Sequence, residues 1–135
     1  MKPNPTVLYI EDHPDNMTLV RRILQKDSYT LLEARSGLQG VSIAEHQDLD
    51  LILLDINLPD IDGYEVVRRL RSSSRASLAH IPIVAITANA LKGDAEKALR
   101  AGCNYYITKP INIQELIEMV ESLTRPPQEE TVYDI

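Results

Sequence analysis

Five short apolar runs recur along the chain, and segments with a different spacing of apolar residues separate them. The runs cover residues 7–10, 29–32, 51–54, 81–86 and 105–108. Short, nearly continuous apolar stretches are typical of strands that are buried on both faces of a sheet. The pattern therefore predicts five strands, and the third of them ends at an acidic residue, Asp55.

The segments between these runs have helical spacing. Met17, Val20 and Leu24 recur at i, i+3 and i+7, and Pro14 suits the first turn of that helix because its missing N–H is no loss there. Two further helices are predicted from a Ser36 cap to Glu45 and over residues 64–71, after Gly63. Another contains Ala95, Ala98 and Leu99 and ends in the left-handed conformation at Gly102. The last begins at Asn112 and Glu115, which resemble a capping box.

A strand followed by a helix, five times over, predicts an α/β fold with a doubly wound parallel sheet and helices on both faces. At 135 residues the chain has room for one domain, which we place at 1–124. Residues 125–135 contain prolines and then acidic residues, so we predict a disordered tail. The Ser-rich segment 72–77 is predicted to be a solvated loop, and the basic residues around it a solvated helix face: Arg68, Arg69, Arg71 and Arg75.

The composition argues against several classes of protein. The net charge of −6 argues against general nucleic-acid binding, which needs a basic face to neutralise phosphates. No apolar run approaches the roughly 18 residues of a membrane-spanning helix, and no signal peptide is visible. The single cysteine, Cys103, fits a reducing compartment and is expected to be a small buried filler. We therefore expect a cytoplasmic protein that binds neither nucleic acid nor membrane.

Acidic residues follow the first and the third predicted strands. Glu11 and Asp12 follow the first, and Asp55 ends the third. If these strands are neighbours in a parallel sheet, the three carboxylates meet at one edge, where open α/β sheets bind their ligands. Like charges that close repel one another, and a hard divalent cation with oxygen ligands relieves the repulsion. The cluster predicts a Mg²⁺ site, the alternative being unrelated strand ends that face solvent.

Two more strand ends bring a hydroxyl and an ammonium group to the same edge. The fourth strand ends at Thr87, and the fifth ends at Lys109. A hydroxyl donor, a cation and a metal around one carboxylate form a site for phosphoryl oxygens. The small side chain of Ala88 leaves room for a phosphoryl donor to approach Asp55.

Four motifs, in this order and spacing, carry a resemblance to a known family. They are Glu11-Asp12, the stretch from Asp55 to Gly63, Thr87-Ala88 and Lys109-Pro110. From residue 6 to residue 123 the chain resembles the receiver domain of two-component response regulators, which has the flavodoxin-like (CheY-like) fold. Residues 79–88 and 92–94 are similar to the DivK-like subgroup of single-domain regulators. The resemblance implies a five-stranded sheet in the order 2-1-3-4-5.

The resemblance assigns the carboxylates their roles. Asp55 would accept the phosphoryl group and would also bind Mg²⁺. Asp12 would bind the metal directly, Glu11 would bind it through water, and Asn57 would offer it a main-chain carbonyl. The first acidic position is Glu11, where many members of the family carry Asp.

The other motif residues receive roles in phosphoryl binding and switching. Thr87 and Lys109 would bind phosphoryl oxygens. Thr87 and Tyr106 would form the conformational switch, and strand alternation places Tyr105 on the opposite face. Asn57 and Asn89 would tune dephosphorylation.

The resemblance implies a signalling protein rather than an enzyme that acts on an external substrate. The domain would take a phosphoryl group from a histidine kinase or a phosphotransfer protein, and would catalyse only its own phosphorylation and dephosphorylation. Its partners would be that donor and a downstream protein target, and a weak homodimer is left open. A module of a larger chain, such as a hybrid kinase, is the alternative context.

Three other functions use part of the same pattern. A haloacid-dehalogenase-like phosphatase also has an Asp nucleophile at a strand end, but it needs a carboxylate two residues later, where this chain has Asn57. A flavin carrier needs a phosphate-binding loop after the first strand, where Glu11 and Asp12 would repel a phosphate. A scaffold that is never phosphorylated would not need the complete acidic set together with Thr87 and Lys109.

Overall fold

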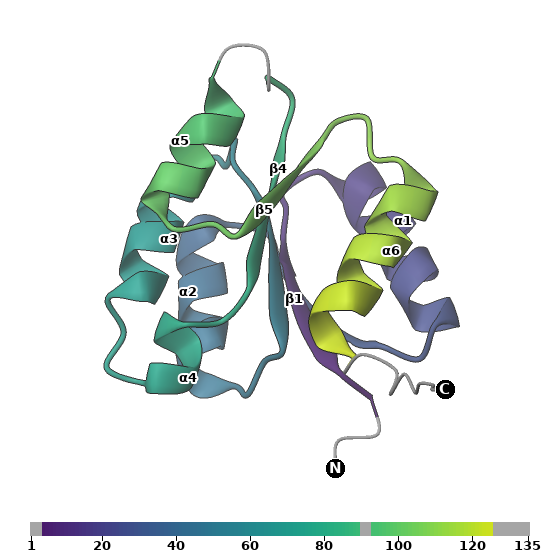
Figure 1. Cartoon of the computed structure of the whole chain (residues 1–135), viewed down its shortest axis with the longest axis horizontal. Coiled ribbons are helices and arrows are strands. Elements are labelled where there is room, and N and C mark those ends of the chain that lie inside the picture. Colours follow the sequence, from purple (N-terminus) through teal and green to yellow (C-terminus); the bar gives the residue numbers. More distant parts are fainter. Residues whose placement is uncertain (1–3, 90–92, 126–135) are drawn as a thin grey trace, which may run out of the picture.

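The computed structural model describes residues 4–89 and 93–125. Strands and helices alternate along this part of the chain (Figure 1). The elements are β1 (Thr6–Ile10), α1 (Pro14–Lys26), β2 (Thr30–Ala34), α2 (Gly37–His46), β3 (Leu51–Asp55), α3 (Gly63–Arg71), α4 (Ala76–Ala79), β4 (Ile83–Thr87), α5 (Asp94–Ala101), β5 (Tyr105–Thr108) and α6 (Ile113–Thr124).

The strands form one parallel sheet in the order β2-β1-β3-β4-β5, which confirms the predicted architecture and strand order. From β1 the chain passes to β2 on one side, and from β2 it crosses back to β3 on the other side of β1, so the direction of winding reverses between β1 and β3. Every residue of β3 and β4 is buried, as the continuous apolar runs predicted. The carboxyl ends of β1, β3 and β4 therefore lie next to one another, at the position where doubly wound sheets bind ligands.

Helices cover both faces of the sheet. Figure 1 shows α2, α3, α4 and α5 on one face and α1 and α6 on the other. Strand alternation sends Leu8 and Ile52 into the core beneath the first group of helices. It sends Val7 and Leu53 into the core beneath α1 and α6. Each such fully buried aliphatic side chain contributes about 1.5–3 kcal/mol to folding.

The predicted helix ends are confirmed at several places. Ser36 Oγ accepts a hydrogen bond from the Gln39 N–H at 3.1 Å, and Asn112 Oδ1 accepts one from the Glu115 N–H at 2.8 Å. Pro14 occupies the first turn of α1. Gly102 ends α5 with φ of +125°, a conformation that side chains with a Cβ rarely adopt.

The Ser-rich segment 72–77 is not merely solvated, so that prediction is wrong. Its last residues begin α4, and the segment is bonded to α2. Ser73 Oγ donates to Glu45 Oε1 at 3.2 Å, and Arg75 Nη1 donates to the main-chain oxygens of Ala44 and Glu45 at 2.8 and 2.9 Å. The two Arg75 bonds satisfy carbonyls at the end of α2, which the helix itself leaves without partners.

Arg71 does not lie on a solvated helix face either. Its guanidinium donates to the main-chain oxygens of Gly102, Ala79 and Ile81 and to Asn104 Oδ1, at distances of 2.7 to 3.1 Å. This side chain therefore joins α3 to the segments around α4 and β5. The prediction holds only for the exposed Arg68 and Arg69, which pair with Glu65 on the surface of α3.

The structure describes the chain up to the cap of α6. Arg125 follows this helix and donates to the Tyr29 hydroxyl at 3.0 Å and to the Asp27 main-chain oxygen at 2.8 Å. The rest of the predicted tail, 126–135, lies outside the described residues. Within the described part of the chain, no helix is both long enough and apolar enough to cross a membrane.

Candidate functional site

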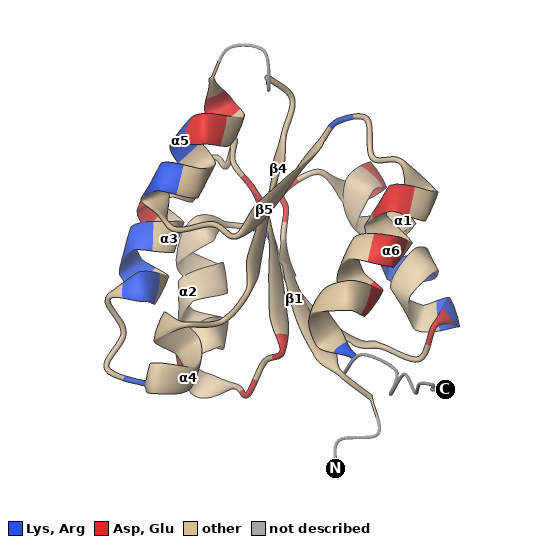
Figure 2. Ribbon diagram, in the orientation of Figure 1, with Lys and Arg blue, Asp and Glu red and all other residues tan. Residues whose placement is uncertain are grey.

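Three carboxylates meet at the ligand-binding edge of the sheet. Glu11, Asp12 and Asp55 each present an oxygen, and these oxygens lie within 4.8 Å of one another. Residues 10 and 54 are partners in the β1–β3 register, so the acidic residues that follow them arrive side by side. Glu11 is completely buried and Asp55 is 2% exposed, which excludes the alternative of unrelated, solvated strand ends. Figure 2 shows acidic residues in red where these central strands end.

Glu11 is fixed by three donors. The Tyr9 hydroxyl donates to Glu11 Oε1 at 2.8 Å, Asn16 Nδ2 donates to the same oxygen at 3.3 Å, and the His13 N–H donates to Oε2 at 3.2 Å. Tyr9 is a functional-site residue that the sequence analysis missed. The signal was present, because residues two apart on a strand share a face.

Lys109 supplies positive charge to the cluster. Its Nζ lies 3.2 Å from Asp55 Oδ1 and 3.8 Å from Glu11 Oε1. The main chain brings it there, because the Lys109 N–H continues the β4–β5 ladder by donating to the Thr87 carbonyl at 2.8 Å. One ammonium group cannot neutralise three carboxylates, so the site keeps an excess of negative charge.

This excess changes the proton affinity of the site. Burial, together with the hydrogen bond and negative charge of Glu11, raises the pKa of Asp55 to about 6, although Lys109 and the Asn57 N–H act in the opposite direction. Burial and the charge of Glu11 also raise the pKa of the Tyr9 hydroxyl, so that it stays a donor. A divalent cation beside Asp55 would favour its ionised form, and the all-oxygen donor set of the cluster fits Mg²⁺.

The loop after Asp55 is held by its own polar contacts. The Asn57 N–H donates to Asp55 Oδ1 at 3.1 Å, and Asp60 accepts from the N–H groups of Gly37 and Leu38 at 2.8 Å each. Asp60 thus ties this loop to the first turn of α2, a role that the sequence analysis did not predict. Gly63 closes the loop, since a Cβ there would lie 2.7 Å from Ile56 Cα.

Thr87 ends β4 beside the cluster, and its side chain is completely buried. Its hydroxyl donates to Asp94 Oδ2 at 3.3 Å and accepts from the Asn89 N–H at 3.2 Å. Asp94, like Tyr9 and Asp60, was given no role from the sequence. Asn57 and Asn89 are exposed at the mouth of the site.

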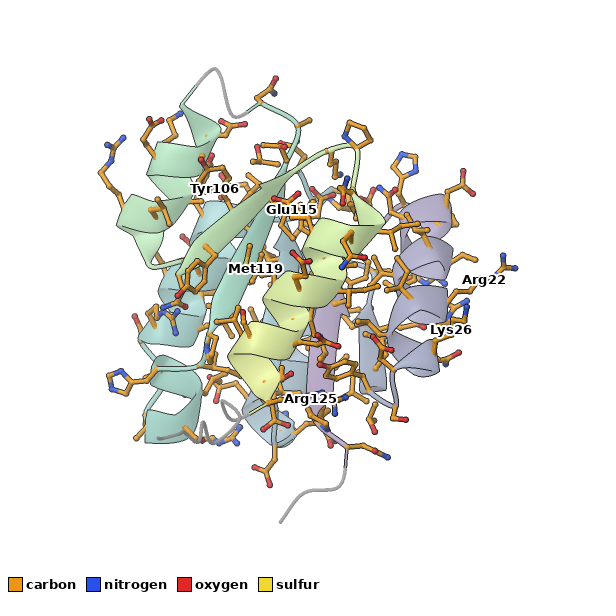
Figure 3. All side chains as sticks on the ribbon, turned by 45° about the vertical axis from the view of Figure 1, so that its right-hand side comes forward. Arg22, Lys26, Tyr106, Glu115, Met119 and Arg125 are labelled. Atoms are coloured by element: carbon orange, nitrogen blue, oxygen red, sulfur yellow. The ribbon has the colours of Figure 1, made fainter. Side chains whose placement is uncertain are left out.

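The predicted switch residue lies outside the carboxylate cluster. Tyr106 is 41% exposed on β5, and Tyr105 is 47% exposed. Both are exposed because β5 is an edge strand that only β4 pairs with in the described sheet. Figure 3 looks onto this side of the molecule, with Tyr106 on β5 and Glu115 and Met119 on α6.

Cys103 is buried, as predicted, and burial raises the pKa of its thiol to about 11. A thiol with so high a pKa is almost entirely protonated near neutral pH and is a poor nucleophile. Its place in the apolar core beneath α3 and α5 supports the prediction of a packing residue.

Comparisons with known proteins agree with this geometry. The response regulator receiver domain family matches residues 7–121. The chain is 40% identical over 117 residues to the polar-differentiation response regulator DivK of Brucella ovis, a match that covers 87% of this chain and 94% of the relative.

Two solved structures are similar in both sequence and fold. One is the receiver domain of sensor histidine kinase PA1611 from Pseudomonas aeruginosa, described with a magnesium ion coordinated in its active site cleft (37% identity, TM-score 0.82, 90% of this chain and 98% of that chain). The other is the receiver domain of the Saccharomyces cerevisiae response regulator Ssk1, crystallised with the histidine phosphotransfer protein Ypd1 (32% identity, TM-score 0.82, 92% and 91% covered). The chain therefore belongs to the response regulator receiver domain family and is a receiver domain of a two-component signalling system.

Proposed function

We propose that Asp55 accepts a phosphoryl group from the phosphohistidine of a sensor kinase or a phosphotransfer protein. The observation that carries the proposal is the position of its carboxylate, buried at a strand end, 3.2 Å from Lys109 Nζ and within 4.8 Å of two more carboxylates. The Ypd1–Ssk1 complex shows that a related receiver binds a histidine phosphotransfer protein. This chain is 32% identical to the Ssk1 receiver, so we infer a donor of the same chemical class.

Glu11, Asp12 and Asp55, with the main-chain carbonyl of Asn57, are the groups that would hold Mg²⁺. When bound, the ion supplies positive charge that offsets the charge of the carboxylates and of the transferred phosphoryl group. Tyr9 and Asn16 hold the Glu11 carboxylate in place for this role. The magnesium ion described in the PA1611 receiver supports the choice of metal.

Asp55 is the nucleophile of the transfer step. One of its oxygens attacks phosphorus, the new O–P bond forms, and the P–N bond to the histidine breaks. The bonding electron pair goes to the imidazole nitrogen, which takes up a proton. Lys109 stabilises the charge on the phosphoryl oxygens because its ammonium group already lies beside Asp55 Oδ1. Attack by water later returns the carboxylate and releases phosphate, and the exposed Asn57 and Asn89 flank the path of that water.

Phosphorylation would then change the surface around β5. The acyl phosphate brings about two negative charges and three acceptor oxygens to the site. The Thr87 hydroxyl turns to donate to one of them, and Tyr106, exposed in this structure, moves inward. The altered surface of α5, β5 and α6 would bind a downstream protein or a second copy of the chain, most simply in the cytoplasm. The acyl phosphate forms and hydrolyses on the domain itself, which makes it a switch with no external substrate.

Incubation with acetyl phosphate and Mg²⁺, followed by intact-mass measurement and a phosphate-affinity gel, tests the proposal. Wild-type protein is expected to gain the mass of one phosphoryl group, and Asp55→Asn is expected to gain none. Equal modification of both proteins would remove Asp55 as the acceptor. Steady turnover of p-nitrophenyl phosphate would instead favour a phosphatase. Phosphotransfer from the histidine kinases of the same organism then identifies the donor.

A further inference from the structure

The Thr87 hydroxyl is already engaged in this structure. It donates to Asp94 Oδ2 at 3.3 Å, and it accepts from the Asn89 N–H at 3.2 Å. A threonine hydroxyl has a single proton to donate. The proton that would serve a phosphoryl oxygen is therefore held by Asp94 as long as this bond persists.

Asp94 is itself held from the other side. It is the first residue of α5, and its second carboxylate oxygen accepts from the Tyr64 hydroxyl of α3 at 3.2 Å. Burial and the charge of Asp94 raise the pKa of Tyr64 to about 12, so the hydroxyl keeps its proton and acts as the donor. The Asp94 carboxylate thus bridges the end of β4 to α3, and both of its oxygens have partners.

We propose that Asp94 is a positioning residue that holds the Thr87 hydroxyl in the unphosphorylated receiver and so weakens the binding of a phosphoryl group at Asp55. The inference rests on the proposed function, because it needs a phosphoryl group for which Asp94 competes. The competition follows from the count of protons: Thr87 must leave Asp94 before it donates to a phosphoryl oxygen. A ligand shifts such an equilibrium only by its differential affinity for the two states, so a stronger Thr87–Asp94 bond means a weaker phosphoryl complex.

Through Asp94, a change at Thr87 can also affect Tyr64 and the surface of α3 and α5. Tyr64 lines a groove of about 390 Å³ between α3 and α5, together with Arg68, Lys97, Arg100 and Ala101. Figure 2 shows the basic residues of α3 and α5 in blue along this side of the molecule. When Thr87 leaves Asp94, the Tyr64 hydroxyl is the side-chain donor that remains on this carboxylate among the described residues, and the packing of α3 against α5 is free to adjust. This surface lies across the sheet from α6.

Beryllofluoride, a non-covalent mimic of a phosphoryl group, allows the competition to be measured as an affinity. Titration calorimetry in the presence of Mg²⁺ would compare the wild type, Asp94→Asn and the control Glu96→Gln. Glu96 is exposed and lies in the same first turn of α5, so its substitution removes the same charge without touching Thr87. Asp94→Asn is expected to bind beryllofluoride about 3- to 10-fold more tightly, because an amide accepts a weaker hydrogen bond than a carboxylate. The affinity of Asp94→Asn for Mg²⁺ alone should equal that of the wild type. The affinity of Glu96→Gln for beryllofluoride should also equal the wild-type value.

The same substitution in a Thr87→Ala background separates positioning from a general effect on α5. Without the hydroxyl there is nothing for Asp94 to hold, so Asp94→Asn is expected to change the beryllofluoride affinity no further. Tyr64→Phe is a second variant: it removes one of the two side-chain donors to the Asp94 carboxylate, which strengthens the Thr87–Asp94 bond, so it should weaken beryllofluoride binding about 2-fold.

Two results would overturn the inference: unchanged or weaker binding by Asp94→Asn, or an equal gain in the Thr87→Ala background. Failure of the wild type and of Glu96→Gln to bind beryllofluoride at all would overturn the proposed function, and the inference with it.

Discussion

The Tyr9 hydroxyl donates a 2.8 Å hydrogen bond to Glu11 Oε1, and both side chains are completely buried. Glu11 directly follows β1, and its N–H continues the β1–β2 ladder by donating to the Ala34 carbonyl, so its side chain points to the same face as that of Tyr9, two residues earlier. The pair lies on the side covered by α1 and α6, where Tyr9 fills the core with its ring and reaches the carboxylate cluster with its hydroxyl. A packing residue of the core therefore also orients a candidate metal ligand.

Tyr9→Phe keeps the ring and removes only this hydroxyl. We expect the free energy of unfolding to fall by about 1–2 kcal/mol, because a buried charged acceptor loses one of its three donors. We also expect weaker Mg²⁺ binding, since the carboxylate is held by fewer contacts. Urea denaturation and calorimetric titration with Mg²⁺ measure the two effects. Tyr105→Phe, at an exposed position of β5, is the control and should change neither value.

The stability of the metal-free protein should depend on pH through Asp55. Its pKa is raised to about 6 in the folded state, above the value of about 4 in an unfolded chain. Between these values the folded state keeps a proton that the unfolded state has lost, so stability falls as the pH rises. Once the pH is above both pKa values, the free energy of unfolding has fallen by a total on the order of 2–3 kcal/mol.

Thermal unfolding in EDTA from pH 4 to pH 8 measures this loss, with Asp55→Asn as the reference. The difference in melting temperature between the variant and the wild type should grow with pH and level off above pH 6. Millimolar Mg²⁺ should reverse the difference by stabilising only the wild type. A difference that is the same at pH 4 and pH 8 would contradict the raised pKa.

Lys109→Met removes the cation beside Asp55 and Glu11. In EDTA at pH 8 we expect a loss of about 1–3 kcal/mol of stability, because two buried carboxylates lose a neighbouring positive charge. Phosphorylation by acetyl phosphate should slow at least about tenfold, the minimum expected when one charged stabiliser of the transition state is lost. Lys97→Met, on the exposed face of α5, removes the same charge far from the cluster and should leave both measurements at wild-type values.

Arg71→Ala tests the guanidinium that joins α3 to the segments around α4 and β5. It leaves the carbonyls of Gly102, Ala79 and Ile81 without this donor, and we expect a loss of about 2–4 kcal/mol. Arg71→Lys should recover little of it, because one ammonium group cannot reproduce a planar fork of donors. Arg69→Ala, which loses only an exposed pair with Glu65, should cost under about 1 kcal/mol. Guanidinium denaturation of the three variants gives the comparison, and similar losses for Arg71→Ala and Arg69→Ala would contradict the structural role of Arg71.

The sequence alone was sufficient for the class of fold and for most of the site. Apolar runs that alternate with helical segments predict a doubly wound parallel sheet, whose carboxyl strand ends lie at one edge, and the resemblance to receiver domains implied the strand order. Glu11, Asp12, Asp55 and Lys109 were predicted to meet for this reason, and the distances bear that out. Helix ends were also predictable, because the caps at Ser36 and Asn112 depend on residues only three positions away.

Only the tertiary structure decided the partners of the polar side chains that join one element to another. Arg71 contacts residues up to 33 positions away, and Asp60 contacts the start of α2, 22 and 23 positions earlier in the chain. Tyr64 and Thr87 meet at Asp94 because α3, β4 and α5 pack together at one corner of the sheet. The spacing of apolar residues determines which face of a helix or strand is buried. Which polar groups then come within 3 Å of one another depends on how the buried faces fit, and a linear pattern does not contain that information.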